Sequence, residues 1–313
     1  MGDEYQQALI QFDAAIRRNP NYAYAYYARG CCYLGLEQAA RALPDFDTAI
    51  LLNPSEADAY RGRAIAHRLL GQYDQAFADA DGAVRLNPHV ADAYLERGIA
   101  YITLKQYAEA IVDFDVVIRL NPRDADAYYN RGYAYRVLEQ YERAFPDLDT
   151  AIRLKPDYAE AYRNRGYAHA YFGRNEQAIA DFDAAIRLDP GDVQAHYSRG
   201  FLYDSLEKYD RAIADYDEAI RLKPDHESAR KKRGHIYLQR QEYDRALADF
   251  DEVIRLNADD ANVYHNRGYV YYQLEDYDRA LADLDAALRL NPDDVAVRET
   301  RDTVYRFLQE QND

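Results

Sequence analysis

An Arg-Gly pair recurs at intervals of 34 residues along most of the chain, and this period constrains the fold more than any other feature. Most pairs belong to a block that also holds a Tyr-Xaa-Xaa-Ala step, an Asp-Xaa-Asp, an Ile-Arg-Leu and usually a proline. A fixed period of this size is typical of stacked, similar units and not of one globular core. Stacks of this kind usually bind other proteins. The pair follows Asn or Ser in Asn130–Gly132, Asn164–Gly166, Ser198–Gly200 and Asn266–Gly268.

Eight blocks follow one another without insertion or deletion from residue 23 to residue 294. Each block carries two apolar patterns of helical spacing, the first over block positions 1 to about 14 and the second over about 18 to 30. A proline at position 32 ends the second pattern in seven of the eight blocks, and Ala258 is the exception. We therefore predict an all-α chain built from helix-turn-helix units.

The eighth residue of each block is small, a glycine in seven blocks and Ala64 in the other. Glycine inside a helix costs about 1 kcal/mol relative to alanine, so we expect a close approach of two helices to require it. The small residue at position 20, such as Ala110, is the expected partner. Large apolar residues at positions 21, 24 and 28, such as Phe182, are expected to form the seam between neighbouring helices.

Composition argues against several classes of partner. The net charge of −16 and the pI near 4.9 disfavour a nucleic-acid backbone and an anionic membrane surface, whereas acids on a solvated outer face keep an open stack in solution. The only cysteines, Cys31 and Cys32, are adjacent, which excludes a disulfide framework and fits a reducing compartment. Since there is neither a signal peptide nor a long apolar run, we expect a soluble, cytoplasmic protein.

No residue pattern in the sequence supports catalysis. The paired aspartates at positions 23 and 25, such as Asp181 and Asp183, do not face each other on a helix. The dipeptide His226-Glu227 lacks the second histidine of a zinc protease motif. There is no glycine-rich phosphate loop and no Gly-Xaa-Ser-Xaa-Gly. We expect a chain that is not an enzyme and that carries neither cofactor nor metal.

The blocks resemble the tetratricopeptide repeat, which has a small residue at position 8, Tyr at 11, Ala at 20, an aromatic residue at 24, Ala at 27 and Pro at 32. The resemblance covers residues 3–309 and implies a right-handed superhelical solenoid with a deep inner channel. Two positions depart from the family: position 4 is mostly Tyr in place of Trp, and position 7 is always Arg in place of Leu. Tyrosines match at position 11, as Tyr33, Tyr101, Tyr135, Tyr203, Tyr237 and Tyr271, and alanines at position 27, as Ala49, Ala83, Ala151, Ala185, Ala219 and Ala287.

The two ends of the chain differ from the repeats. Residues 1–22 match only a second helix, so Leu9, Phe12 and Ile16 are expected to lack full cover, as in a fragment of a longer protein or an end that another molecule covers. Residues 23–294 form the eight repeats. Residues 295–313 match only a first helix followed by a tail, and Asp302 at its position 8 suits an outer, wet face. We interpret this segment as a capping helix.

The arginine at position 7 admits two interpretations. A position that holds Leu in the family is partly covered, and a covered Arg needs a carboxylate. We predict that Arg131, Arg165 and Arg199 lie in the repeat interfaces and pair with aspartates of the preceding helix. The partners are expected among Asp115, Asp149 and Asp183. The alternative is a row of arginines that binds an acidic ligand.

The resemblance implies that a ligand binds the inner face, formed by positions 2, 5, 6, 9, 12 and 13 of the first helices. Tyr and Arg dominate binding hot spots, and Asn offers a donor and an acceptor to a peptide backbone. An alternative for the position-9 tyrosines is packing on neighbouring repeats. The candidate peptide-binding residues are Tyr129, Asn130, Tyr133, Arg136, Arg163, Asn164, Tyr167, Tyr171, Tyr197, Phe201, Lys231, Asn266 and Tyr269.

We therefore predict a scaffold that binds an extended peptide or partner segment in a concave groove. The alternative is a structural protein that self-associates through its uncapped N-terminal helix. A chaperone C-terminal carboxylate is not the expected ligand, because no block has the Asn at position 9 that the clamp of other family members requires. The basic run Arg230–Arg233 is either an anchor for an acidic segment or a solvated face.

Overall fold

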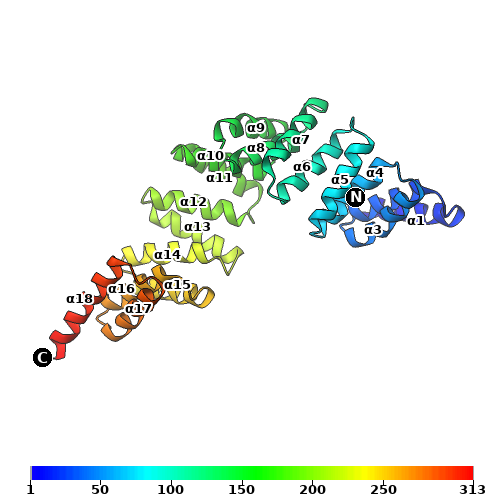
Figure 1. Cartoon of the computed structure of the whole chain (residues 1–313). Helices are drawn as coiled ribbons and strands as arrows, with labels where there is room; N and C mark the ends of the chain where they lie inside the picture. Colours follow the sequence, from blue (N-terminus) through cyan, green and yellow to red (C-terminus); the bar gives the residue numbers. More distant parts are fainter. Residues whose placement is uncertain (1, 313) are drawn as a thin grey trace. The chain divides into compact units, whose positions relative to one another are not determined.

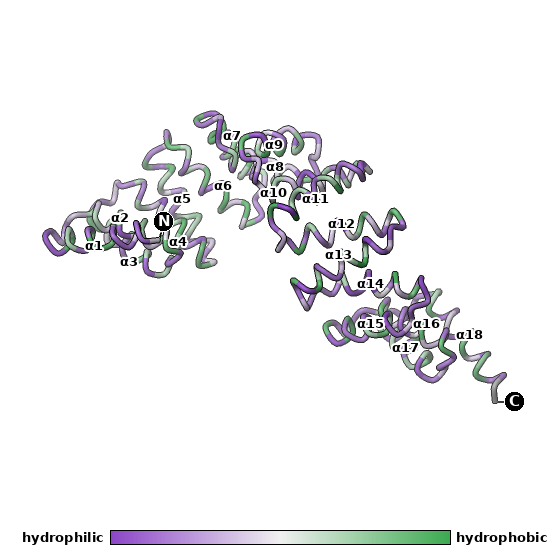
Figure 2. Tube along the Cα trace, turned by 180° about the vertical axis from the view of Figure 1, so that it is seen from behind, coloured by the Kyte–Doolittle hydropathy of each residue, from purple (hydrophilic) through white to green (hydrophobic). Residues whose placement is uncertain are grey.

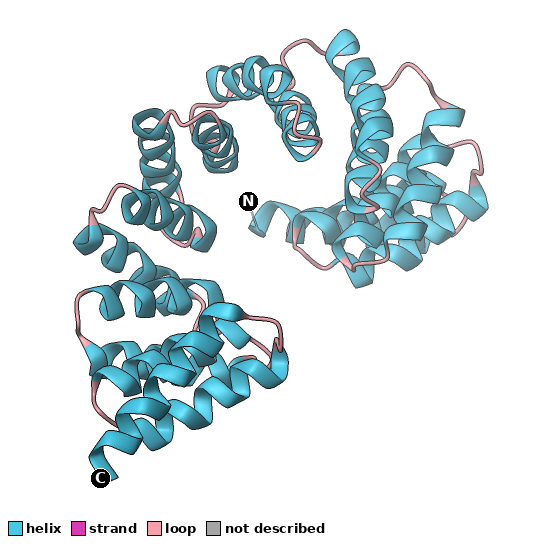
Figure 3. Ribbon diagram, turned by 60° about the vertical axis from the view of Figure 1, so that its left-hand side comes forward, coloured by secondary structure: helices cyan, strands magenta, loops and turns pink. Residues whose placement is uncertain are grey.

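The computed structural model describes residues 2–312. Within this range the chain forms α-helices and no β-strands (Figures 1 and 3). After α1, each block contributes one first helix of 13 residues and one second helix of 14 residues, joined by a short loop. The helices are α1 (Gly2–Arg18), α2 (Ala23–Gly35), α3 (Ala39–Leu52), α4 (Ala57–Leu69), α5 (Tyr73–Leu86), α6 (Ala91–Thr103), α7 (Tyr107–Leu120), α8 (Ala125–Val137), α9 (Tyr141–Leu154), α10 (Ala159–Tyr171), α11 (Asn175–Leu188), α12 (Val193–Ser205), α13 (Tyr209–Leu222), α14 (Glu227–Gln239), α15 (Tyr243–Leu256), α16 (Ala261–Gln273), α17 (Tyr277–Leu290) and α18 (Val295–Asn312).

The chain divides into two compact units, Met1–Ala168 and His169–Asp313, whose boundary lies within α10. In the N-terminal unit, successive helices from α1 to α9 pack against one another. In the C-terminal unit the same holds from α11 to α18. First helices also contact the next first helix, as α4 does with α2 and α6, and as α14 does with α12 and α16. The first helices of each unit therefore lie side by side and form one continuous face.

The left-handed residue at position 15 ends each first helix. Its φ is close to +60° at non-glycine residues such as Glu37 and Glu139, and is +73° at Gly71 and +68° at Gly173. Glycine adopts this conformation without strain, whereas other residues pay for it. Because the pattern of residue types at position 15 is mixed, the sequence alone did not indicate this turn.

The core of each repeat is the side chain at position 24, which inserts between helices. Phe46, Phe114, Phe182, Tyr216 and Phe250 are fully buried. Figure 2 shows hydrophobic and hydrophilic residues alternating along the helices, as expected when each helix buries one stripe. A solenoid has no single central core, so its stability is the sum of these small interfaces.

The glycines at position 8 make room mainly for this core side chain. The predicted partner at position 20 is met at Gly268, where an added Cβ would lie 3.2 Å from the carbonyl oxygen of Ala280. A Cβ added at Gly98 would lie 2.6 Å from Cε1 of Phe114, and one at Gly30 would lie 2.9 Å from Cε1 of Phe46. Alanine replaces glycine at position 8 only in the block that also carries Ala80 at position 24. A smaller core residue thus leaves room for one extra methyl group.

The position-7 arginines form a ladder of ion pairs, as predicted. Nη1 of Arg131 lies 2.6 Å from Oδ1 of Asp115 on the preceding second helix, and Nη1 of Arg165 lies 2.7 Å from Oδ1 of Asp149. Arg199 pairs with Asp183 at 2.6 Å. In the six repeats that have a tyrosine at position 4, the arginine also faces the ring of that tyrosine, at 5.4–5.7 Å. This favourable contact joins the two positions that depart from the family pattern, although Arg199 and Arg233 stand with His196 and Arg230 at position 4.

The two end helices are covered to different degrees. Helix α1 has no buried residue, Ile10 is 67% exposed, and Leu9, Phe12 and Ile16 are only half-buried. Helix α18 buries Val297 and Val304 against α17, whereas Asp302 is exposed. Within residues 2–312, no helix combines the length and the apolar character that a bilayer span requires.

Candidate peptide-binding face

We call the surface formed by positions 2, 5, 6, 9, 12 and 13 of the first helices the first-helix face. In the eight repeats these positions hold six acidic and six basic residues, although the whole chain carries a net charge of −16. The excess of acid therefore lies on other positions. A face that is neutral within an acidic chain avoids general repulsion of anionic ligands, so individual charged residues decide what it accepts.

Arg136 on α8 is a charged residue of this face that contacts two tyrosine rings and one asparagine. Its guanidinium carbon lies 5.2 Å from the ring centre of Tyr133 and 5.3 Å from that of Tyr167, so that both rings contribute to holding the cation. Its Nε donates a hydrogen bond of 2.7 Å to Oδ1 of Asn164. Four predicted site residues from two neighbouring first helices are thus brought together.

Asn164 is buried, with 2% exposure, and its amide is engaged within the protein. Nδ2 donates to the carbonyl oxygen of Glu160 at 2.8 Å and lies 3.4 Å from the hydroxyl of Tyr129, while Oδ1 accepts from Arg136. The amide therefore orients Arg136 and Tyr129. The backbone of a ligand would have to displace these bonds to use it.

Tyr129 packs on Tyr158, the last residue of the turn between α9 and α10, with ring centres 4.6 Å apart. Burial raises the pKa of Tyr129 to about 12, against the opposing effect of the Arg163 charge. Burial also raises the pKa of Tyr158, over whose ring Nζ of Lys155 lies at 4.3 Å. Tyr158 was not among the predicted site residues, because it stands at position 34 and not on a first helix.

Asn130 occupies the same block position as Asn164 but has a different environment. Its Nδ2 donates to the carbonyl oxygen of Asp126 one turn earlier, at 2.8 Å, and the side chain is partly exposed. Two asparagines at equivalent positions are therefore not equivalent in structure. Arg163 is half-buried on α10, and its charge acts on the phenol of Tyr129.

In the C-terminal unit, the predicted residues occur as separate contacts. The Tyr197 ring lies 4.9 Å from that of His226 and 5.9 Å from that of Tyr216. Phe201 is 44% exposed. Nζ of Lys232 lies 4.9 Å from its ring centre.

Lys231, in contrast, is engaged with Asp260, whose Oδ2 lies 2.6 Å from Nζ. Its charge is thus compensated within the protein. The sequence did not predict the contact between Tyr197 and His226, because His226, like Tyr158, stands at position 34 and not on a first helix.

The remaining candidates lie near the C-terminal end and at the start of the C-terminal unit. Tyr269 is 40% exposed and lies beside Tyr272, with ring centres 6.1 Å apart. Both line a cavity of about 330 Å³ with residues of α18. Asn266 is half-buried. Tyr171 is 61% exposed at the end of α10 and meets Phe172 edge-on.

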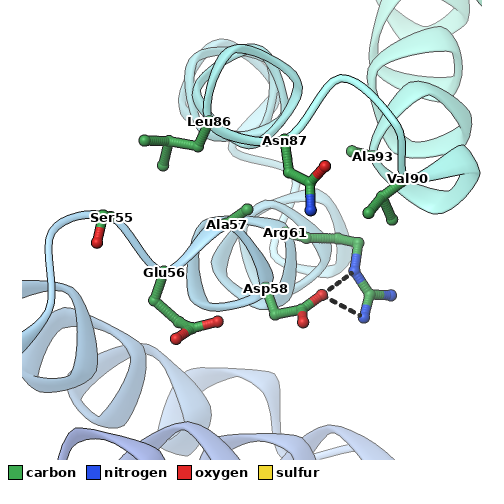
Figure 4. Close-up of a pocket in the computed structure, with 9 residues that line it drawn as sticks. All are labelled: Ser55, Glu56, Ala57, Asp58, Arg61, Leu86, Asn87, Val90 and Ala93. Atoms are coloured by element: carbon green, nitrogen blue, oxygen red, sulfur yellow. Dashed lines mark hydrogen bonds and ion pairs between the residues drawn. The ribbon is translucent and has the colours of Figure 1, made fainter.

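A second cavity, of about 150 Å³, lies among α4, α5 and α6 in the N-terminal unit (Figure 4). Arg61 lines it, and its guanidinium group donates to Oδ1 of Asp58, as Figure 4 shows, and lies 3.3 Å from Asp92. The arginine is therefore neutralised by two acids. In the part of the chain that the structure describes, no group of His, Cys, Asp or Glu side chains is arranged to hold a metal ion.

Comparisons with known families bear on most of the chain. Models described as tetratricopeptide repeat match residues 27–88, 129–193, 163–227 and 234–304, and one described as TPR repeat matches residues 100–137. A search of curated proteins gives no significant match.

Solved structures with a similar fold include the APC/C hetero-tetramer Cut9-Hcn1, at 18% identity and a TM-score of 0.60. That match covers 93% of this chain but only 57% of the other, so this chain spans little more than half of that protein. PilF of Pseudomonas aeruginosa matches at 19% identity and a TM-score of 0.60, covering 68% of this chain and 97% of the other. A repeat protein of Parabacteroides merdae matches at 20% identity and a TM-score of 0.54, covering 81% and 100%. At these identities the likeness concerns the fold alone.

Proposed function

Since the chain belongs to the tetratricopeptide repeat family, we propose that it is a non-enzymatic scaffold that binds an extended peptide or a partner segment along the first-helix face. The observation that carries this proposal is the arrangement of Tyr133, Arg136 and Tyr167 across α8 and α10. Aromatic and arginine side chains supply most of the energy in binding hot spots. Rings that are already held in place lose little conformational freedom on binding.

The proposal also concerns the partner class, the compartment and the layout. A net charge of −16 supports protein or peptide partners over nucleic acid or anionic membrane. Two free cysteines, Cys31 and Cys32, support a cytoplasmic location. The layout that we propose is a leading half repeat over residues 1–22, eight repeats over residues 23–294, and a closing helix with its tail over residues 295–313.

Selection of random dodecapeptides displayed on phage against the immobilised full chain tests the proposal. We expect enrichment of peptides whose binding falls at least tenfold with Tyr133→Ala/Tyr167→Ala. The matched control is Tyr73→Ala/Tyr305→Ala, which removes two other tyrosines that are 44% and 43% exposed and lie off the first-helix face. Selected peptides that bind the first variant as tightly as the wild type would refute the location of the site.

Self-association is a second candidate function, and the exposure of α1 favours it. Ile10 is 67% exposed on a helix without a buried residue. An unpartnered apolar face tends to associate. Sedimentation velocity over a concentration series would reveal a mass that rises with concentration, and Ile10→Asp would abolish the rise. A constant monomer mass rejects this candidate.

A further inference from the structure

Two arginines, Arg68 and Arg136, stand at position 12 of their repeats, and their hydrogen-bond partners differ. Nε of Arg68 contacts Oε2 of Glu96 at 3.3 Å. Nε of Arg136 donates to Oδ1 of Asn164 at 2.7 Å. In both pairs the partner is 28 residues later, at position 6 of the next repeat. The contact between position 12 and position 6 of the next repeat therefore occurs twice, but the partner carries a charge of −1 as Glu96 and no charge as Asn164.

The consequence is that Arg68 is compensated and Arg136 is not. Glu96 is largely buried, and the Arg68 charge opposes the rise of its pKa that burial causes. For Arg136, the described residues include no carboxylate within ion-pair distance and no hydrogen-bond partner for either Nη atom. On α10, the charges of Glu160 and Arg163 act on the phenol of Tyr129 with opposite signs.

The surroundings of the two guanidinium groups also differ. Arg136 lies between the rings of Tyr133 and Tyr167, both at position 9 of their repeats. The equivalent residues around Arg68 are Ile65 and Ile99. Two rings and one hydrogen bond to the buried Asn164 restrict the rotamers of Arg136 before any ligand arrives. A group that is held in advance loses less entropy when it binds.

We propose that Arg136 is a preformed receptor for a single carboxylate, namely an Asp or Glu side chain of the segment that binds the first-helix face. This inference rests on the proposed function and deepens it. The two Nη groups match the two oxygens of a carboxylate. A phosphate dianion is a poorer ligand, because one guanidinium group offsets only part of its charge. At Arg68 the carboxylate of Glu96 already fills the role that the ligand carboxylate would fill at Arg136.

The experiment uses the peptides selected on the full chain, each paired with a version in which every Asp and Glu is changed to Asn and Gln. Affinities are measured by fluorescence anisotropy for the wild type, Arg136→Gln and Asn164→Glu. The last variant copies the Arg68–Glu96 pair, so it places an internal carboxylate on Arg136. Arg143→Gln is the control, because Arg143 also lies over a tyrosine ring, that of Tyr135 at 4.2 Å, but stands on the second helix α9 and off the first-helix face. Circular dichroism confirms that each variant is helical.

We expect at least one acidic residue of the peptide whose conversion to the amide weakens binding to the wild type by about tenfold or more, the usual worth of a charge-assisted hydrogen-bond pair. The same change should have less than a twofold effect on Arg136→Gln and on Asn164→Glu, and its full effect on Arg143→Gln. Peptides that bind without acid dependence, or whose dependence survives in Arg136→Gln, overturn the receptor while the proposed scaffold stands. If no peptide is enriched at all, both proposals fail. Loss of acid dependence in Arg136→Gln but not in the folded Asn164→Glu variant would also contradict the receptor.

Discussion

Arg131 and Asp147 are joined by two parallel hydrogen bonds, from Nε to Oδ2 at 2.7 Å and from Nη2 to Oδ1 at 2.6 Å, between the two helices of one repeat. Asp147 is buried, with 5% exposure. The third contact of the arginine, with Asp115, joins the repeat to its predecessor. One guanidinium group therefore connects three successive helices, and the same arrangement recurs at Arg29, Arg63, Arg97, Arg199, Arg233 and Arg267.

The two aspartates should contribute unequally. Asp147→Asn removes the buried carboxylate and leaves the half-buried Arg131 without its bidentate partner, and we expect a loss of about 2–4 kcal/mol in unfolding free energy. Asp115→Asn, whose side chain is 45% exposed, should cost less than about 1 kcal/mol. Urea unfolding followed by circular dichroism measures both. Equal losses for the two variants would contradict a dominant role for the bidentate pair.

Gly98→Ala should destabilise the chain despite the better helix propensity of alanine. The new methyl group would meet Phe114 at 2.6 Å, and overpacking of this kind typically costs about 1–3 kcal/mol. The control is Gly82→Ala, whose Cβ would lie at an ordinary 3.4 Å from Tyr60. That variant should be neutral or more stable by up to about 1 kcal/mol. Thermal unfolding distinguishes them, and a stabilised Gly98→Ala variant would show that position 24 does not require the glycine.

Tyr216→Phe should stabilise the protein. Tyr216 is fully buried, and its hydroxyl has no hydrogen-bond partner among the described residues. Phenylalanine fills the same position in four other repeats, as Phe46, Phe114, Phe182 and Phe250. Removing an unsatisfied buried hydroxyl is expected to raise the unfolding free energy by about 1 kcal/mol. Tyr73→Phe, at an exposed site, should have no effect, and a less stable Tyr216→Phe variant would indicate that the hydroxyl is bonded.

Stability should fall at high pH in part because of Tyr129. Its pKa is about 12 in the folded chain and near 10 when unfolded, so between these values the unfolded chain binds fewer protons than the folded one. Unfolding free energy therefore decreases as pH rises, by about 1 kcal/mol from this group between pH 9 and pH 11. The decrease over that interval, measured by urea unfolding, should be smaller by this amount in Tyr129→Phe. An identical decrease in both proteins would show that the phenol is not held neutral by burial.

The sequence predicted the helices and the ladder to Asp115 because both repeat every 34 residues, so each position is seen many times. It did not predict the bidentate bond to Asp147, because only the preceding helix was considered as the partner of Arg131. The burial of Asn164 depends on a residue 28 positions earlier: Arg136 binds it, whereas the equivalent residue before Asn130 is Ile102. Contacts that vary from repeat to repeat are not visible in the repeat pattern, and these are the contacts that form the candidate site.

Hydrogen–deuterium exchange of the full chain, with and without a selected peptide, tests the central claim most directly. Binding along the first-helix face should slow exchange in α8 and in the part of α10 before Ala168, around Tyr133, Arg136 and Tyr167, and leave the exposed side of the second helices α7 and α9 unchanged. Protection confined to second helices or to α1 would contradict the account, because the ligand would then occupy a different surface.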